Sequence, residues 1–410
     1  MALPTYPAGR HRGASAAGPL VPHAPGGAHA TARSSPPRAA RAVGRLDGLD
    51  LARGLAVLSM LVAHLSPVGG PVNLTENLTA PLFAVVIGVS MGVRLTRRPT
   101  GPGAFVLDNV LRGLVLVVLG VALQALYGQI DVVLPYLGLL VIVLAPLALA
   151  LHRAPLLAVG LGVAGAVLSP IAMDRAREEL AAGSPGPTAT TLVEWLAAGH
   201  SYRLTSLLPM ALGGLALATL LPRAGEPPRG YGVAAVLLGS SLAAYLLGYA
   251  SEAGARAYSG TTAEVVGATL LASGTVVVAF LLVEVARAPR VRALAAPVLA
   301  PVLATGRLAL TAYTVQVLLL AGVGLLRGGA PDDGWGMLAA ALVVVLGSCW
   351  ALDRWWGTGP LEWVLWWLRS PWRPAGEPDR PTDRGTEHAV GARDHGDAAD
   401  ALSARSGGSR

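Results

Sequence analysis

Long apolar runs separated by short polar connections dominate this chain. A helix of about 20 apolar residues crosses the hydrocarbon core of a bilayer. Ten runs of roughly that length can be found, at 51–67, 78–95, 107–127, 132–151, 154–173, 204–221, 231–250, 262–285, 300–326 and 336–353. The pattern therefore predicts an all-α fold, a polytopic transmembrane helix bundle of about ten spans.

Two polar segments flank the predicted bundle. Residues 1–44 are rich in Ala, Pro, Gly and Arg and show no apolar period, and residues 374–410 mix charges in the same way. Such segments bury too little apolar surface to offset the entropy of ordering the chain. We therefore expect disordered tails on either side of one membrane domain at 45–373.

Composition agrees with a membrane-embedded core. Only 13% of the 410 residues are charged, whereas 53% are hydrophobic, and soluble domains carry about 25% charge. All 31 basic residues are arginine, which suggests a GC-rich bacterial genome. The arginines gather at span ends and in the tails without an aromatic stripe, so the net charge of +7 does not indicate nucleic-acid binding.

The arginines also predict the topology. An even number of spans places both tails on one side, and most span-end arginines fall on that same side. Because cytoplasmic loops are enriched in Arg and Lys, both termini are predicted to be cytoplasmic, in a bacterial inner membrane. The longest opposite connection, 174–203, holds an amphipathic stretch at 192–196 that fits an interfacial helix or lid.

Several enzyme classes have no support in the sequence. The chain has no P-loop, no H-E-x-x-H pair and no G-x-S-x-G elbow. Its single cysteine, Cys349, excludes a disulfide framework and a cysteine metal site. We expect no bound metal.

Ionisable side chains inside spans are costly, so each is a functional candidate. The first span carries Asp50, Arg53 and His64. Arg53 and His64 are eleven residues apart, which is about 20° from three full helical turns and a rise of about 16 Å. One face of this helix therefore presents an arginine near one membrane surface and a histidine near the other.

This pair suggests acyl-transfer chemistry. A histidine can take a proton from a hydroxyl or amine acceptor at neutral pH, and an arginine can hold a phosphate-bearing donor by bidentate hydrogen bonds. The structural alternative is a helix start in which the acids favour the dipole and Arg53 snorkels, with His64 as a satisfied interfacial side chain.

A second polar cluster opens the ninth predicted span. Thr305 is predicted to cap the helix, and Arg307, Thr311 and Thr314 form one stripe. Tyr313 and Gln316 form a neighbouring pair at i, i+3. Arg307 could join Arg53 at the same cytoplasmic mouth and, with Thr311, bind the donor. The alternative is an interhelical hydrogen-bond seam.

Four further residues are weaker candidates. Glu76 lies in the first outer loop and could orient His64, or be solvated there. Asp131 and Tyr136 could line a cavity at an outer turn, or simply begin a helix. Glu362 follows the last span and could pair with a mouth arginine, or anchor an interfacial helix.

Two parts of the chain resemble known membrane families. The run 45–58 followed by His64, and then 80–90, is similar to the start of bacterial heparan-alpha-glucosaminide N-acetyltransferase-like proteins, assigned to 45–100. Residues 306–316 and 359–363 resemble the carboxy-terminal part of the YeiB-like family, assigned to 204–370, and 131–138 resembles another stretch of that family. The Arg53–His64 spacing is also similar to that of membrane O-acyltransferases of bacterial surface polysaccharides.

The resemblance implies an integral membrane acyltransferase that takes an acetyl or acyl group from cytoplasmic acyl-CoA. The acceptor would be a sugar, glycolipid or other envelope molecule on the outer side, with His64 and Arg53 as catalytic residues. The histidine of the lysosomal enzymes lies in the loop after the first span, whereas this chain offers only His64, just before that loop. The alternatives are a transporter or flippase-like protein for a small anion or envelope precursor, and a non-catalytic component of an envelope-synthesis complex. The sequence is compatible with an oligomer.

Overall fold

The computed structural model describes residues 46–67, 75–97, 101–126, 131–183, 186–221, 227–251, 256–328 and 334–369. Within these ranges the chain forms helices and connections and contains no β-strand, so the all-α prediction is confirmed. The predicted tails, 1–44 and 374–410, lie outside the described residues.

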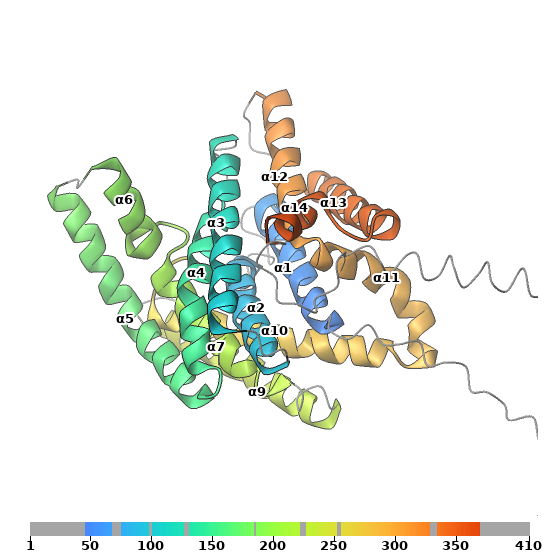
Figure 1. Ribbon diagram of the computed structural model, residues 1–410, viewed down its shortest axis with the longest axis horizontal. Helices are drawn as coiled ribbons and strands as arrows, with labels where there is room; N and C mark the ends of the chain where they lie inside the picture. The colour runs from blue at the N-terminus through green and yellow to red at the C-terminus, as the bar shows by residue number, and fades with distance from the viewer. Residues whose placement is uncertain are drawn as a thin grey trace, which may run out of the picture. The chain divides into compact units, whose positions relative to one another are not determined.

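Membrane-spanning helices make up most of the described chain (Figure 1). Nine of the described helices are long and apolar enough to cross a bilayer, and α7 (Leu204–Leu217) is a shorter apolar helix. Together they correspond to the ten predicted spans. The nine are α1 (Asp47–Leu65), α2 (Glu76–Arg97), α3 (Pro102–Leu126), α4 (Leu134–Leu151), α5 (Pro155–Ala182), α9 (Pro227–Ala250), α10 (Thr262–Ala286), α12 (Ala309–Leu326) and α13 (Trp335–Trp355).

Four remaining helices complete the described chain. Between α5 and α7 lie α6 (Pro187–Val193) and the π-helix η2 (Glu194–Ala198), which include the amphipathic stretch 192–196. The other two are α11 (Pro289–Arg307), which precedes α12, and α14 (Pro360–Arg369), which follows α13.

Close packing of small residues holds the centre of the bundle together. A β-carbon on Gly88 of α2 would meet the backbone carbonyl of Ala211 in α7, and one on Gly214 of α7 would meet Val85 in α2. Glycine at both positions lets the two backbones approach, as is common where helices pack inside membranes. Helix α1 lies in this interior, against α2, α10, α11 and α13.

The predicted ninth span, 300–326, is two helices rather than one. Helix α11 ends at Arg307, Leu308 adopts a non-helical ψ of 36°, and α12 begins at Ala309. Gly306 lies directly against the Asp50 carbonyl of α1, where a side chain would collide. This close crossing, together with Pro297 and Pro301 inside α11, accounts for the break.

The break corrects two predictions about polar residues. Thr305 does not cap a helix, because it lies inside α11 and its hydroxyl donates to the Pro301 carbonyl at 2.9 Å. Arg307 does not share a helical stripe with Thr311 and Thr314, because Leu308 separates their helices. The spacing of polar residues in the sequence continues through residue 308, whereas the helical backbone is interrupted there.

Helix α1 defines two ends of the bundle. The Arg53 end is the one at which α1 begins. The His64 end, at which α1 finishes, also carries the start of α2, residues 131–133, the connection 199–203 and the start of α10, as the contacts described below show.

Candidate functional site

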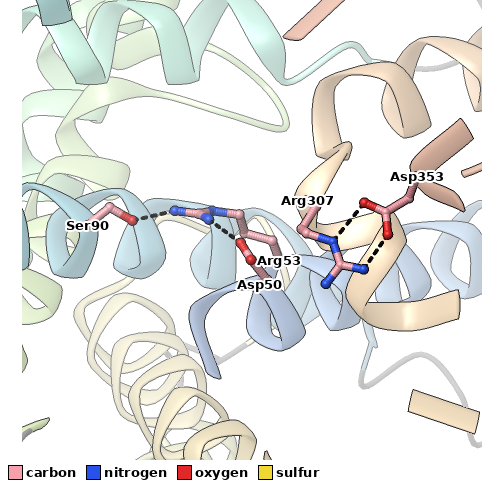
Figure 2. A network of polar contacts seen from close by, with 5 residues as sticks. All are labelled: Asp50, Arg53, Ser90, Arg307 and Asp353. Atoms are coloured by element: carbon pink, nitrogen blue, oxygen red, sulfur yellow. Dashed lines mark hydrogen bonds and ion pairs between the residues drawn. The ribbon is translucent and has the colours of Figure 1, made fainter. Parts of the chain in front are cut away.

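At the Arg53 end, Arg53 links α1 to α2 (Figure 2). Its guanidinium donates to Asp50 Oδ1 at 2.9 Å and to the Ser90 hydroxyl of α2 at 2.7 Å. Asp50 is 0% exposed, while about a quarter of the Arg53 side chain reaches the surface. A buried carboxylate needs such a partner, because an uncompensated charge in a low-dielectric interior is costly.

Arg307 lies near the same group but binds a different acid. Its Nε donates to Asp353 of α13 at 2.8 Å, and a second guanidinium nitrogen donates to the other Asp353 oxygen (Figure 2). This is the bidentate arrangement that arginine forms with carboxylates. The charges of Asp50 and Asp47 also act on Arg307. The structure thus brings Arg53 and Arg307 together around Asp50, and each already carries a carboxylate partner.

Glu362 is a helix cap supplied from another helix. Its carboxylate accepts the backbone N–H groups of Leu310 and Thr311, both at 3.0 Å, and the Thr311 hydroxyl. The first N–H groups of a helix have no partner within it, and the break at Leu308 exposes those of α12. Glu362 of α14 therefore stabilises the start of α12, and Thr311 is engaged in that cap.

At the opposite end, His64 lies near Asp131. The two groups interact electrostatically, and the Ser201 hydroxyl donates to the Asp131 carboxylate. The backbone N–H of Val133 donates to the Tyr313 hydroxyl at 3.1 Å. Four segments distant in sequence, α1, 131–133, the connection before α7, and α12, therefore meet at the His64 end.

Four aromatic side chains form a continuous row at this end, which we call the aromatic row. Trp195 of η2 lies 6.1 Å from Tyr136 of α4, Tyr136 lies 5.6 Å from Tyr202, and Tyr202 lies 5.5 Å from Tyr258, between ring centroids. Tilted and edge-on contacts at these separations are favourable for aromatic rings. Burial raises the pKa of Tyr258 to about 12, so its hydroxyl stays neutral at physiological pH.

Sequence reasoning missed a buried pair of opposite charges beside this row. Arg203 is 1% exposed and Glu264 is 6% exposed. The Glu264 carboxylate accepts N–H groups from Gly260 at 2.7 Å and Tyr258 at 3.2 Å, while Arg203 donates to the Tyr258 carbonyl. Glu264 was an ionisable residue inside the predicted span 262–285, which is the signal that could have found it.

A small polar cavity lies between these groups. We call it the Arg203 cavity, and its polar lining includes Glu76, Tyr202, Arg203, Tyr258 and Glu264. Burial lowers the pKa of Arg203 below its ordinary value. Its buried Nε has no hydrogen-bond partner in the protein, which is rare for a buried donor and makes Arg203 a candidate ligand contact.

Gln316 is a second incompletely bonded group. It lies one turn beyond Tyr313 on α12, is 1% exposed, and its side-chain oxygen has no partner. The weaker sequence candidates Glu76, Asp131, Tyr136 and Tyr313 all contribute to the His64 end, whereas Glu362 does not. Among the described residues, no group of three or more His, Cys, Asp or Glu side chains could hold a metal ion.

Comparison with known families matches the carboxy-terminal part of the chain. A family model described as "Protein of unknown function (DUF418)" matches residues 218–370. The match contains Tyr258, Glu264, Arg307 and Glu362, and it falls on the part predicted to be YeiB-like. Arg53, His64 and the predicted N-acetyltransferase-like start lie outside it. No curated protein matches the chain. The chain is thus a multi-helix membrane protein whose carboxy-terminal part matches the DUF418 family of membrane proteins.

Proposed function

We propose that this protein is an integral membrane acyltransferase. It would move an acetyl or acyl group from cytoplasmic acyl-CoA at the Arg53 end to a sugar or other envelope acceptor at the His64 end. The observation that carries the proposal is that His64 lies on the same helix as Arg53 and interacts electrostatically with Asp131, whose carboxylate also accepts the Ser201 hydroxyl.

At the His64 end the chemistry needs a base and a place for the acceptor. The acceptor O–H or N–H attacks the acyl carbonyl carbon while the imidazole of His64 takes its proton, and the C–S bond breaks to release the thiol of coenzyme A. Alternatively, His64 carries the acyl group transiently. The negative charge of Asp131 attracts the imidazolium that forms, against the larger cost of burying that charge. The Arg203 cavity measures only about 20 Å³, room for about one water molecule, so an acceptor would bind at the partly exposed rings of Tyr136 and Trp195.

At the Arg53 end the donor would bind by its phosphates. Arg53 and Arg307 are each about a quarter exposed, so a phosphate can approach them although both already bind carboxylates. A donor held there must extend its thioester along α1 by about 16 Å to reach His64. We propose that this end faces the cytoplasm of a bacterium, because Arg94, Arg97, Arg153 and Arg287 also gather at the helix ends on this side.

One observation favours a transporter or flippase-like protein instead. The α11–α12 break places a helix interruption beside Arg307, and interrupted helices often mark substrate sites in transporters. Transporters of this kind usually have two interrupted helices, one in each of two matching halves. Among the described residues there is one such break, and Glu362 accepts hydrogen bonds from the N–H groups that it exposes at the start of α12. A non-catalytic envelope component is the third possibility.

Acyl-CoA binding and hydrolysis by the purified full-length chain in detergent would test the proposal. Wild type should hydrolyse a short-chain acyl-CoA slowly or form a covalent acyl adduct. His64→Ala should lower that rate by about 10²–10⁴-fold, the usual contribution of a general base. Arg53→Lys should weaken donor binding more than it lowers the rate at saturation, because lysine loses the bidentate contact.

Two matched controls make the result specific. His152→Ala changes a histidine at the end of α4, whose ring bonds the Leu149 carbonyl, and Arg97→Ala removes an exposed arginine. Both should leave donor binding and hydrolysis unchanged. If wild type neither binds nor hydrolyses any acyl-CoA, the acyltransferase proposal is wrong, and uptake of anions into liposomes becomes the next measurement.

A further inference from the structure

A large apolar groove lies away from the Arg203 cavity, on the lipid-facing side of α5, α7, α9 and α10. It encloses about 370 Å³, within the usual range for small-ligand sites, and none of its described lining residues is ionisable. We call it the α5–α7 groove. Its lining includes Leu156, Val159 and Val163 of α5 and Pro209, Gly213 and Leu217 of α7.

Helix periodicity and small residues create this groove. Positions 156, 159, 163 and 166 recur at three- and four-residue intervals, which places them on one face of α5. Gly162 of α5 packs directly against Pro209 and Gly213 of α7, and Gly213 faces Thr269 of α10, so small residues form the floor of the groove. Leu156 is 86% exposed at its edge, so the groove opens to the outside of the helix bundle.

The rim at the Arg53 end carries positive charge. Arg153 is exposed in the turn between α4 and α5, two residues before Pro155, which lines the groove. His152 lies beside it in the same turn. An arginine near a membrane surface attracts anionic lipid headgroups. An apolar groove with a cationic rim is complementary to a lipid that has an apolar tail and an anionic head.

A hydrocarbon chain is the occupant that suits an apolar groove on the outside of a membrane helix bundle. A helix with its side chains is about 10–12 Å wide. A single hydrocarbon chain is much narrower and can follow the groove along α5. Acyl chains are also the medium that surrounds these spans.

We propose that the α5–α7 groove binds a membrane glycerophospholipid with an anionic headgroup. One acyl chain lies between α5 and α7, and the headgroup phosphate lies at Arg153. Apolar burial alone gives little preference inside a bilayer, so affinity comes from van der Waals packing in the groove and from the charge at its rim. This site is separate from the proposed acyl-transfer path, and the proposal does not depend on it.

Photocrosslinking with phosphatidylglycerol that carries a diazirine on one acyl chain tests the site. The full-length protein is reconstituted in nanodiscs, illuminated, and digested, and the labelled residues are mapped by mass spectrometry. Label should concentrate on 155–166 of α5 and on 209–220, which covers the second half of α7 and the turn after it. Val163→Trp places a bulky ring where the acyl chain would lie and should reduce labelling there by about tenfold, since the chain loses its van der Waals packing in the groove.

Two control variants separate the groove from general lipid contact. Val343→Trp adds the same ring to an exposed position of α13 (73% exposed) and should leave the labelling unchanged. Arg153→Gln should reduce the preference for phosphatidylglycerol over phosphatidylcholine by about fivefold, while Arg97→Gln should not. Labelling spread evenly over α5, α9 and α13 in wild type would overturn the proposal, whether or not any variant folds. So would protection of the groove by a second copy of the chain.

Discussion

Helix α1 connects two ends of the helix bundle, and these ends differ in how their buried charged groups are bonded. At the Arg53 end, Arg53 bonds Asp50 and Ser90, Arg307 bonds Asp353, and Glu362 completes the start of α12. At the His64 end, the buried Arg203 Nε has no partner. The buried Thr358 hydroxyl, just before α14, has none either, so the two ends differ in their charged groups: the arginines of the Arg53 end are paired with carboxylates, whereas a guanidinium nitrogen of Arg203 is unbonded. Buried polar groups are nearly always bonded, which makes Arg203 the better candidate for a ligand contact.

This difference between the two ends separates residues expected to stabilise the fold from residues expected to act on a substrate. Arg53 and Arg307 connect α1 and α11 to α2 and α13, so part of their role is to hold the bundle together. The candidate residues at the His64 end form fewer ion pairs between helices. We therefore expect substitutions at the Arg53 end to cost stability, and substitutions at the His64 end to cost activity.

Asp50→Ala should have the largest effect on stability. It leaves the Arg53 guanidinium without its buried carboxylate, and breaking a buried pair in this way costs about 3–5 kcal/mol. Thermal unfolding in detergent, followed by circular dichroism, measures the loss. Glu284→Ala is the control, because its pair with Arg287 is exposed and such pairs contribute under about 1 kcal/mol. Equal losses in both variants would contradict the structural role of Asp50.

Gly306→Ala should have the next largest effect. The added β-carbon would collide with the Asp50 carbonyl, which cannot move without displacing α1, and overpacking of this kind costs about 1–3 kcal/mol. The same unfolding measurement applies. Gly322→Ala on α12 places its β-carbon in open space and should be neutral or slightly stabilising. If Gly306→Ala unfolds like wild type, α1 and α11 do not cross as closely as described.

Glu362→Ala should have a moderate effect. It removes the acceptor for the first N–H groups of α12, and loss of a helix cap costs about 1 kcal/mol. Hydrogen exchange resolved by peptide should show faster exchange at 309–312 than in wild type. Faster exchange confined to α14 would mean that Glu362 stabilises its own helix and not α12.

Gln316→Leu should have the smallest effect on stability, and of opposite sign. It replaces a buried amide whose oxygen has no partner, and an apolar group of similar size is neutral or stabilising there by up to about 1 kcal/mol. Any acyl-CoA hydrolysis should fall in the same variant if the amide contacts the ligand. Destabilisation together with unchanged activity would assign Gln316 to the scaffold and weaken the contrast between the two ends.

Prediction from sequence succeeded where a property is local. Hydropathy identified the helices, and the spacing of Arg53 and His64 placed them at opposite ends of α1. It failed at 300–326, because the break at Leu308 depends on the contact between Gly306 and the Asp50 backbone, which no local pattern records. It also missed Arg203, which lies at the end of a long connection and becomes buried only when Tyr258 and Met173 pack against it.

The sequence alone determined an all-helical membrane protein, because hydrocarbon permits few other spanning structures and runs of about 20 apolar residues reveal each crossing. It also determined which ionisable residues lie in the spans. Only the tertiary structure decided which of these are partnered. Asp353 reaches Arg307 and Glu362 reaches α12 through contacts between residues 46 and 52 positions apart. Such contacts follow from how the helices pack, and hydropathy carries no information about them.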